Sequence, residues 1–254
     1  MSKYFLPYLQ IDITNKCNLN CAGCSHFSPL VTKDTVYFYD VNQYEKELKQ
    51  LATMFEFGQI ALLGGEPLLH PDIEKFIEVS EAIYPNSQII IKTNGSKTDI
   101  CNRLLDKYNN RGDLFKLQLS EYPEIDSNNI NYNIKRSRAN FRNIGLDING
   151  NQDKYKNVRC PGAKCINLFN GKLILCGIMR NIDLFINYFN LQDKMKICSD
   201  DYAIDIYNHN AVEIMDFLQN FDTGRDVCRF CNPSKTNISH SISKRDINEW
   251  ISKE

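Results

Sequence analysis

The sequence has no long apolar run and no long run of basic residues. No segment approaches the ~18 consecutive apolar residues that a membrane-spanning helix needs, and residues 1–8 contain no apolar stretch of signal-peptide length. No run of Lys and Arg is longer than the pair Lys135-Arg136, and the formal net charge is -1. These absences argue against a membrane protein, a secreted protein and a nucleic-acid-binding protein. We therefore expect a cytoplasmic protein.

The sequence also lacks internal repeats and low-complexity linkers. Its 254 residues, 43% of them hydrophobic, suffice for one barrel-like domain, or for a domain of roughly 150 residues and a smaller one. In a reducing compartment the ten cysteines are not expected to form disulfides, so metal or redox chemistry is favoured for those that cluster. We interpret Cys101, Cys165 and Cys198, outside the clearest clusters, as small buried hydrophobic residues.

Between residues 8 and 120, short apolar segments alternate with amphipathic ones, a pattern typical of βα units with a parallel sheet. The predicted strands are Tyr8 to Ile13, Gln59 to Leu63, Ser87 to Lys92 and Leu114 to Leu119. The predicted helices are one that begins after Asp40 with Gln43 in a capping box, one from Pro71 to Tyr84, and one capped by Thr98 that contains Tyr108.

Beyond Ser120 the pattern weakens, and it suggests only strands near Tyr132 to Lys135 and Gly145 to Ile148. The segment from Cys165 to Cys176 predicts a hairpin, because Asn170-Gly171 is a strong turn signal. A helix capped by Asn210, with Glu213 three residues on, is predicted next. We expect two domains, residues 1–155 and residues 156–254, the second ending in a helix.

Three cysteines, Cys17, Cys21 and Cys24, follow the first predicted strand in one short loop. A [4Fe-4S] cluster is usually held by four cysteines, so three leave one iron open to a small molecule. Zinc also binds paired cysteines, but no fourth ligand is evident nearby, and His26 is more simply interpreted as a loop histidine.

The sequence Gly64-Gly65-Glu66-Pro67 stands at the end of the second predicted strand, one βα unit after the cysteine loop. Together these motifs resemble the radical S-adenosylmethionine (radical SAM) superfamily. The resemblance implies an α/β fold with a partial (β/α)6 TIM-like barrel. It also implies that the open iron binds S-adenosyl-L-methionine, which one electron cleaves to a 5′-deoxyadenosyl radical. The two glycines allow the backbone to come close to the cofactor, and the Glu66 carboxylate could accept a hydrogen bond from the cofactor's ammonium group.

By the same resemblance, polar residues at further strand ends become candidates for cofactor binding. The predicted cofactor-binding residues are Gly64, Gly65, Glu66, Thr93, Asn94, Ser120 and Arg136. The alternative to cofactor binding for Thr93 and Asn94 is a simple turn. The alternative for Arg136 is an exposed, solvated side chain. Gly23 stands where the family often has an aromatic residue before its third cysteine, so Phe27 is the candidate for the adenine contact. No catalytic residue is assigned.

A second group of cysteines lies in the C-terminal part: Cys160, Cys176, Cys228 and Cys231. Their spacing resembles the twitch module of radical SAM enzymes, a small α+β relative of the SPASM domain, and implies a second, fully ligated [4Fe-4S] cluster. Cys165 could replace Cys160 as the first ligand. A structural zinc site with four cysteines is the alternative, because both are tetrahedral sulfur sites.

The leading hypothesis is a radical SAM oxidoreductase that abstracts hydrogen from a C–H bond of a small, sugar-like substrate and oxidises an alcohol carbon. The auxiliary cluster would accept or relay an electron, and flavodoxin or ferredoxin would serve as external reductant. The alternatives are a peptide or protein maturase, and an epimerase in which Cys165 or Cys198 returns hydrogen. A zinc-stapled interaction module without redox chemistry is the alternative outside enzymes.

Overall fold

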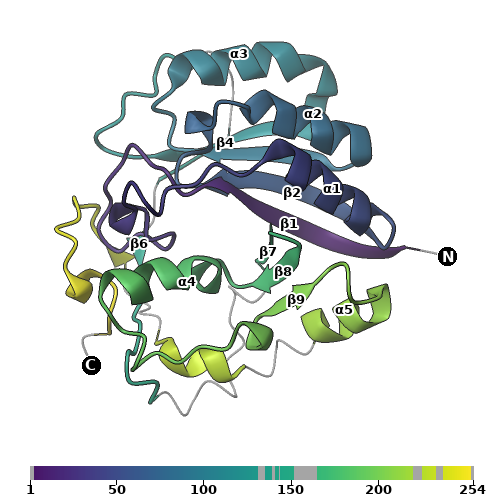
Figure 1. The fold of residues 1–254 in the computed structure, drawn as a ribbon. Coiled ribbons are helices and arrows are strands. Elements are labelled where there is room, and N and C mark those ends of the chain that lie inside the picture. The colour runs from purple at the N-terminus through teal and green to yellow at the C-terminus, as the bar shows by residue number, and fades with distance from the viewer. Residues whose placement is uncertain are drawn as a thin grey trace. The chain divides into compact units, whose positions relative to one another are not determined.

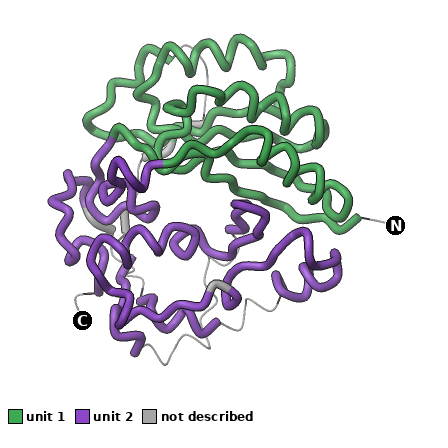
Figure 2. The backbone as a smooth tube through the Cα atoms, in the orientation of Figure 1, with its two compact units in different colours: residues 1–18, 37–139 green, residues 19–36, 140–254 purple. Residues whose placement is uncertain are grey.

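The structure is a computed structural model that describes residues 3–130, 135–138, 141–142, 144–151, 165–219, 225–232 and 237–252. It divides into two compact units (Figure 2). Unit 1 holds residues 1–18 and 37–139, and unit 2 holds residues 19–36 and 140–254. This division differs from the predicted domains 1–155 and 156–254. No helix in the described ranges is long and apolar enough to cross a membrane.

Unit 1 is built on a parallel sheet in the order β5-β4-β3-β2-β1. The strands are β1 (Tyr4–Thr14), β2 (Phe55–Gly64), β3 (Gln88–Thr93), β4 (Phe115–Glu121) and β5 (Lys135–Arg138). The four strands predicted before residue 120 are therefore confirmed, each with small shifts at its ends. This α/β arrangement with a mostly parallel sheet is consistent with a partial TIM-like barrel.

Three helices, α1 (Val41–Ala52), α2 (Ile73–Ile83) and α3 (Thr98–Tyr108), follow the first three strands and lie on one side of the sheet (Figure 1). Asp40 caps α1 as predicted, because its side chain accepts from the backbone N–H of Gln43. Short 3-10 turns η1 (Ser28–Leu30), η2 (Pro67–Leu69) and η3 (Asn109–Leu114) complete the described helical segments before residue 130.

The predicted N-cap of α3 is wrong. Thr98 is the first residue of the helix, and Lys97 occupies the cap position without a side-chain hydrogen bond to the helix. The helix is held instead by its apolar side, where Cys101, Leu104 and Tyr108 are buried.

The two faces of the unit 1 sheet differ in chemistry. Along β1, the fully buried Leu9, Ile11 and Ile13 alternate with Gln10 and Asp12. The strand register places further polar and apolar residues on the same face as Gln10 and Asp12; these are Gln59, Ala61, Leu63, Gln88, Ile90, Lys92 and Gln118. This face thus combines hydrogen-bonding side chains with a small apolar cluster, in which Ala61, Leu63 and Ile90 pack with Tyr8.

Unit 2 contains an antiparallel sheet of β7 (Ile166–Phe169), β8 (Lys172–Leu175) and β9 (Ala203–Asp205). The predicted hairpin is confirmed, and Asn170 and Gly171 both have positive φ, 47° and 73°, as a two-residue turn of this kind requires. Two helices, α4 (Gly177–Tyr188) and α5 (Ala211–Gln219), also belong to this unit.

The capping box of α5 is confirmed. Asn210 Oδ1 accepts from the N–H groups of Val212 and Glu213, and Glu213 Oε2 accepts from the N–H of Asn210. The remaining elements are short: β6 (Phe141–Arg142) pairs antiparallel with β10 (Asn237–Ile238), and the 3-10 turns are η6 (Ser199–Asp201), η8 (Asp226–Phe230) and η9 (Ile247–Glu249).

Two expectations for the second half fail in the described residues. Leu146 forms isolated bridges to Cys231 and Ile251 in place of the strand predicted from Gly145 to Ile148. The described C-terminal residues 237–252 contain the single turn η9 where a helix was predicted. The predicted strand near Tyr132 falls largely outside the described residues, which resume at β5.

An aromatic cluster forms the centre of the unit 2 core. Phe27, Phe185 and Trp250 are fully buried, with ring centroids 5.5 to 6.4 Å apart. Buried aromatic side chains contribute much of the apolar area of a core and fix its geometry. The loop at residues 19–36 therefore belongs to the core of unit 2 through Phe27.

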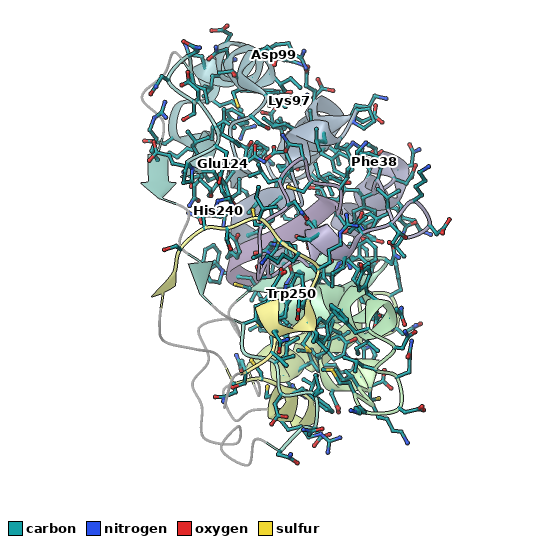
Figure 3. All side chains as sticks on the ribbon, turned by 90° about the vertical axis from the view of Figure 1, so that its left-hand side faces the viewer. Phe38, Lys97, Asp99, Glu124, His240 and Trp250 are labelled. Carbon is teal, nitrogen blue, oxygen red and sulfur yellow. The ribbon has the colours of Figure 1, made fainter. Side chains whose placement is uncertain are left out.

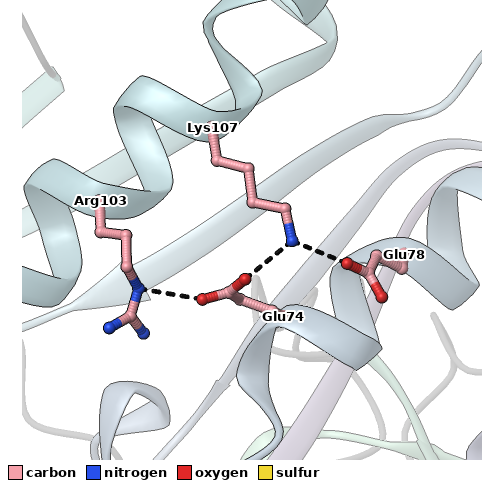
Figure 4. A network of polar contacts seen from close by, with 4 residues as sticks. All are labelled: Glu74, Glu78, Arg103 and Lys107. Atoms are coloured by element: carbon pink, nitrogen blue, oxygen red, sulfur yellow. Dashed lines mark hydrogen bonds and ion pairs between the residues drawn. The ribbon is translucent and has the colours of Figure 1, made fainter.

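A network of charges links α2 to α3 (Figure 4). Glu74 accepts from Arg103 Nε at 3.0 Å and from Lys107 Nζ at 2.8 Å, and Lys107 also donates to Glu78 at 2.8 Å. The hydrogen bond from Lys107 is the main cause that lowers the pKa of Glu74, although burial opposes it. Because these side chains are partly exposed, the network contributes only modestly to stability.

We predict that Glu74→Gln lowers the free energy of unfolding by about 0.2–1 kcal/mol at pH 7. The folded pKa of Glu74 lies below its unfolded value, so the stabilisation is present above the ordinary Glu pKa of about 4.3 and is lost as the pH falls through the folded value. Urea unfolding at pH 7 and pH 3 measures both effects. Glu45→Gln, which removes a single pair to Lys49, is the matched control and should cost less. A difference from wild type that is no smaller at pH 3 than at pH 7 would contradict this account.

Candidate functional site

The glycine pair after β2 lies directly against the end of β1. The N–H of Gly65 donates to Thr14 O at 2.8 Å, and the N–H of Glu66 donates to Lys16 O at 2.8 Å. A Cβ at Gly64 would lie 2.1 Å from Thr14 O, and one at Gly65 would lie 2.2 Å from Lys16 O. The glycines are therefore required by the backbone that leads into the cysteine loop. The sequence predicts that these glycines allow close approach to the cofactor, whereas the contact with the backbone at Thr14 and Lys16 was not predicted.

Glu66 is the centre of the candidate cofactor site. Its side chain is 1% exposed, and its carboxylate accepts from Leu68 N at 3.0 Å, Thr93 Oγ1 at 2.7 Å and Asn94 N at 2.8 Å. Burial raises the pKa of Glu66, while these three donors and Lys97 oppose the shift. The carboxylate thus ties the end of β2 to the end of β3, and the predicted contact with the cofactor ammonium stays a prediction.

Asn18, between the first two cysteines, joins the cysteine loop to the same strand end. Its Oδ1 accepts from Asn94 Nδ2 at 3.0 Å, and its Nδ2 donates to Ser96 Oγ at 2.8 Å. Asn94 Oδ1 in turn accepts from the N–H of Ser96 at 2.9 Å. Asn18 is not among the predicted site residues, although its position inside the cysteine motif is a usable signal.

Thr93 and Asn94 are both buried at this strand end, so the structure brings these two predicted residues together with Gly64, Gly65 and Glu66. Ser120 lies at the end of β4, where the register pairs it with Ser137. Arg136, on β5, donates to Ser127 Oγ at 2.9 Å and to Glu121 Oε1 at 3.4 Å. Its guanidinium thus holds the loop after β4, and its predicted role in cofactor binding stays a prediction.

The three cysteines of the loop form no disulfide in the part of the chain that the structure describes; Cys21 is buried, and Cys17 and Cys24 are partly buried. Burial alone would raise the pKa of the Cys24 thiol, but the hydrogen bond and charge of His26, with backbone N–H groups of Ser28 and His26, outweigh it. The pKa of Cys24 therefore lies below its ordinary value, which favours the thiolate that metals bind. The described residues contain no group of three His, Cys, Asp or Glu side chains already converged as metal ligands.

Two features of the loop differ from expectation. Phe27 is fully buried in the unit 2 core against Phe185 and Trp250, so its ring does not offer an adenine contact. His240, from the distant C-terminal segment, places Nε2 3.3 Å from Cys21 Sγ. Nothing in the sequence pattern pointed to His240.

The C-terminal cysteines lie in two local pairs. The N–H of Cys176 donates to Cys165 O at 3.2 Å across the open end of the β7–β8 hairpin, and the N–H of Cys231 donates to Cys228 O at 3.0 Å. Cys160 lies outside the described residues. Cys176 and Cys228 both pack against the unit 2 core. These contacts place Cys165 beside a predicted ligand, and the second cluster itself stays a prediction.

Comparison with known proteins places the chain in a family. The family model described as "Radical SAM superfamily" matches residues 11–157. The chain is 34% identical over 95 residues to GTP 3′,8-cyclase from Chlorobaculum tepidum and 28% identical over 92 residues to the same enzyme from Nautilia profundicola. These alignments cover 37% and 35% of this chain but only 27% and 28% of those proteins, so the chain spans little more than a quarter of their length.

A solved structure matches over most of the chain. BtrN in complex with AdoMet and 2-DOIA has a TM-score of 0.56 at 17% identity, covering 91% of this chain and 94% of that chain. At this identity the likeness concerns the fold. Because the family match spans more than half of the chain, the protein belongs to the radical SAM superfamily. Membership implies a [4Fe-4S] cluster and S-adenosylmethionine, and the three reduced cysteines of the loop, together with the lowered pKa of Cys24, fit such a cluster.

We predict that Gly65→Ala disrupts the cysteine loop, because the new Cβ would overlap Lys16 O. Overpacking of this kind costs about 1–3 kcal/mol, and here it also displaces the residues before Cys17. Thermal unfolding and iron content after anaerobic reconstitution measure the two effects. Gly112→Ala is the control, because a Cβ there meets no atom within 4 Å, although the positive φ of 53° adds some strain. Equal iron uptake by both variants would refute the proposed role of Gly65.

Proposed function

We propose that the protein is a radical SAM oxidoreductase that oxidises an alcohol carbon of a small, sugar-like molecule. The observation that carries the proposal is the hydrogen-bonded cradle at the strand ends, where Glu66, Thr93 and Asn94 meet the cysteine-loop residue Asn18. This cradle joins the two motifs that define the cofactor chemistry. When bound, the cluster and S-adenosylmethionine supply a 5′-deoxyadenosyl radical after one-electron reduction.

The chain's own residues have separate tasks in this proposal. Cys17, Cys21 and Cys24 would hold the cluster, and the iron without a protein ligand would be open to S-adenosylmethionine. Glu66 and Asn94 fix the strand ends that surround the cofactor. Their burial, at 1% and 6% exposure, keeps water away and strengthens each polar contact.

The polar face of the unit 1 sheet supports a hydroxyl-rich substrate. The register pairs Asp12 on β1 with Leu63 on β2, and Lys92 on β3 with Gln118 on β4. Asp12 is 1% exposed, and Lys92 Nζ lies 5.1 Å from the centre of the Tyr8 ring. Carboxylate, ammonium and amide groups suit the donors and acceptors of a polyol better than those of an apolar ligand. The fold match to BtrN, solved with 2-DOIA, agrees with a small substrate.

The reaction balances with one external electron and one internal acceptor. The bound cofactor would supply the radical that removes hydrogen from the carbon that bears the hydroxyl, with 5′-deoxyadenosine as the by-product. The substrate radical then loses the hydroxyl proton and one electron to become a carbonyl. We assign that electron to an auxiliary [4Fe-4S] cluster held by Cys176, Cys228, Cys231 and either Cys160 or Cys165, in a twitch-like module.

The alternatives predict different outcomes. A peptide maturase would modify a peptide and release more 5′-deoxyadenosine in its presence, and an epimerase would return hydrogen from a thiol such as exposed Cys198. A zinc-stapled module would contain zinc and no iron. The proposal therefore requires iron, sulfide and cofactor cleavage before any choice of substrate.

We predict that anaerobically prepared protein is brown, holds about eight irons if both clusters form, and releases 5′-deoxyadenosine when reduced with S-adenosylmethionine. Cys21→Ala should abolish that product, measured by liquid chromatography with mass spectrometry. Cys101→Ala is the matched control and should retain it, because burial raises the pKa of Cys101 to about 12 and keeps it a core thiol. Colourless protein with zinc, or undiminished product in Cys21→Ala, would refute the proposal.

A further inference from the structure

The C-terminal segment of unit 2 pairs with the cysteine loop. The N–H of Ala22 donates to Ser241 O at 2.9 Å, and the N–H of Ser243 donates to Asn20 O at 2.7 Å. Between them, Cys21 and Ile242 form an antiparallel bridge. The backbone on both sides of Cys21 is therefore fixed by a segment more than two hundred residues away in the sequence.

The same segment is anchored at its far end. Trp250 is fully buried, and its Nε1 donates to Cys24 O at 2.9 Å. Asp246 and Glu249 form a capping box around η9, and Ser243 Oγ donates to Glu249 Oε2 at 2.5 Å. Figure 3 labels His240 and Trp250 on this segment. Residues 240–250 thus form an anchored segment that hydrogen-bonds to the backbone around Cys21 and Cys24, and His240 is its first residue.

His240 brings an imidazole to the sulfur of Cys21, with Nε2 3.3 Å from Sγ. When Cys21 is a thiol and binds no metal, either Cys21 Sγ or His240 Nε2 could donate the proton of this hydrogen bond. A metal-bound thiolate has no proton and can only accept, so Nε2–H must then be the donor. A donor hydrogen bond to a cluster thiolate stabilises the extra negative charge of the reduced cluster and thereby raises its reduction potential.

We propose that His240 is a positioning residue of the radical SAM cluster, which donates Nε2–H to Cys21 Sγ and raises the reduction potential of that cluster. The inference rests on the proposed function, since it requires a cluster on Cys21. It adds a residue outside both sequence motifs, from the last part of the chain. The bond makes the cluster easier to reduce by the external one-electron donor.

Two substitutions at His240 separate the hydrogen bond from the shape of the side chain. His240→Phe fills the same space without a donor, whereas His240→Gln places an amide N–H near the position of Nε2. His209→Ala is the matched control, because His209 is an exposed histidine of unit 2 whose Nδ1 lies 3.0 Å from Asp205 O. The readout is a redox titration followed by electron paramagnetic resonance, using the signal that changes when S-adenosylmethionine is added.

We expect a lower midpoint potential for His240→Phe, and values near wild type for His240→Gln and His209→Ala. Iron content should stay equal to wild type in all three, which separates a lost hydrogen bond from a lost cluster. An unchanged potential in His240→Phe, or an equal decrease in His240→Gln, would overturn the role of His240 while leaving the proposed function intact. Wild-type protein with no cluster that responds to S-adenosylmethionine would overturn the proposed function, and this inference with it.

Discussion

The buried carboxylate of Glu66 is the interaction on which the candidate site depends. A carboxylate at 1% exposure is costly unless donors satisfy it, and here a hydroxyl and two backbone N–H groups do so. Those donors belong to the turn after β2 and to the end of β3. The free-energy cost of burying the charge is therefore offset only when the ends of β2 and β3 are held close enough for all three donors to reach the carboxylate. Asn94, fixed in this way, holds Asn18 in the cysteine loop.

A second constraint acts on the other side of the loop. The backbone next to Gly64 and Gly65 packs against the residues that precede Cys17. The backbone of Ser241 and Ser243 hydrogen-bonds to the residues on either side of Cys21. Three thiolates spread over eight residues must reach a common geometry to hold a cluster, and an unsupported loop of that length samples many conformations. Each cysteine is instead tied to a rigid element of its own unit, which lowers the conformational entropy lost when a cluster binds.

The sequence predicted the elements that depend on local rules. Periodicity predicts the parallel strands before residue 120. Short-range hydrogen bonding predicts the N-cap at Asp40, the hairpin turn at Asn170 and the capping box at Asn210. Helix α4 was not predicted although Met179, Ile182 and Phe185 repeat at helical spacing, because Cys176 stands at its N-cap and no capping side chain marks its start. Phe27 and His240 were beyond local rules: the first is placed by packing against Phe185 and Trp250, and the second meets a residue 219 positions away. Long-range packing and pairing decide both, and a single sequence carries no signal for them.

We propose that the three-cysteine loop holds a cluster with one iron left to S-adenosylmethionine. Mössbauer spectroscopy of the iron-reconstituted protein is the sharpest test, because each iron reports its own coordination. We expect one iron of a cluster to change its spectrum when S-adenosylmethionine is added, while the others keep the spectra of thiolate-bound sites. Spectra that show every iron with a protein ligand, unchanged by the cofactor, would contradict it.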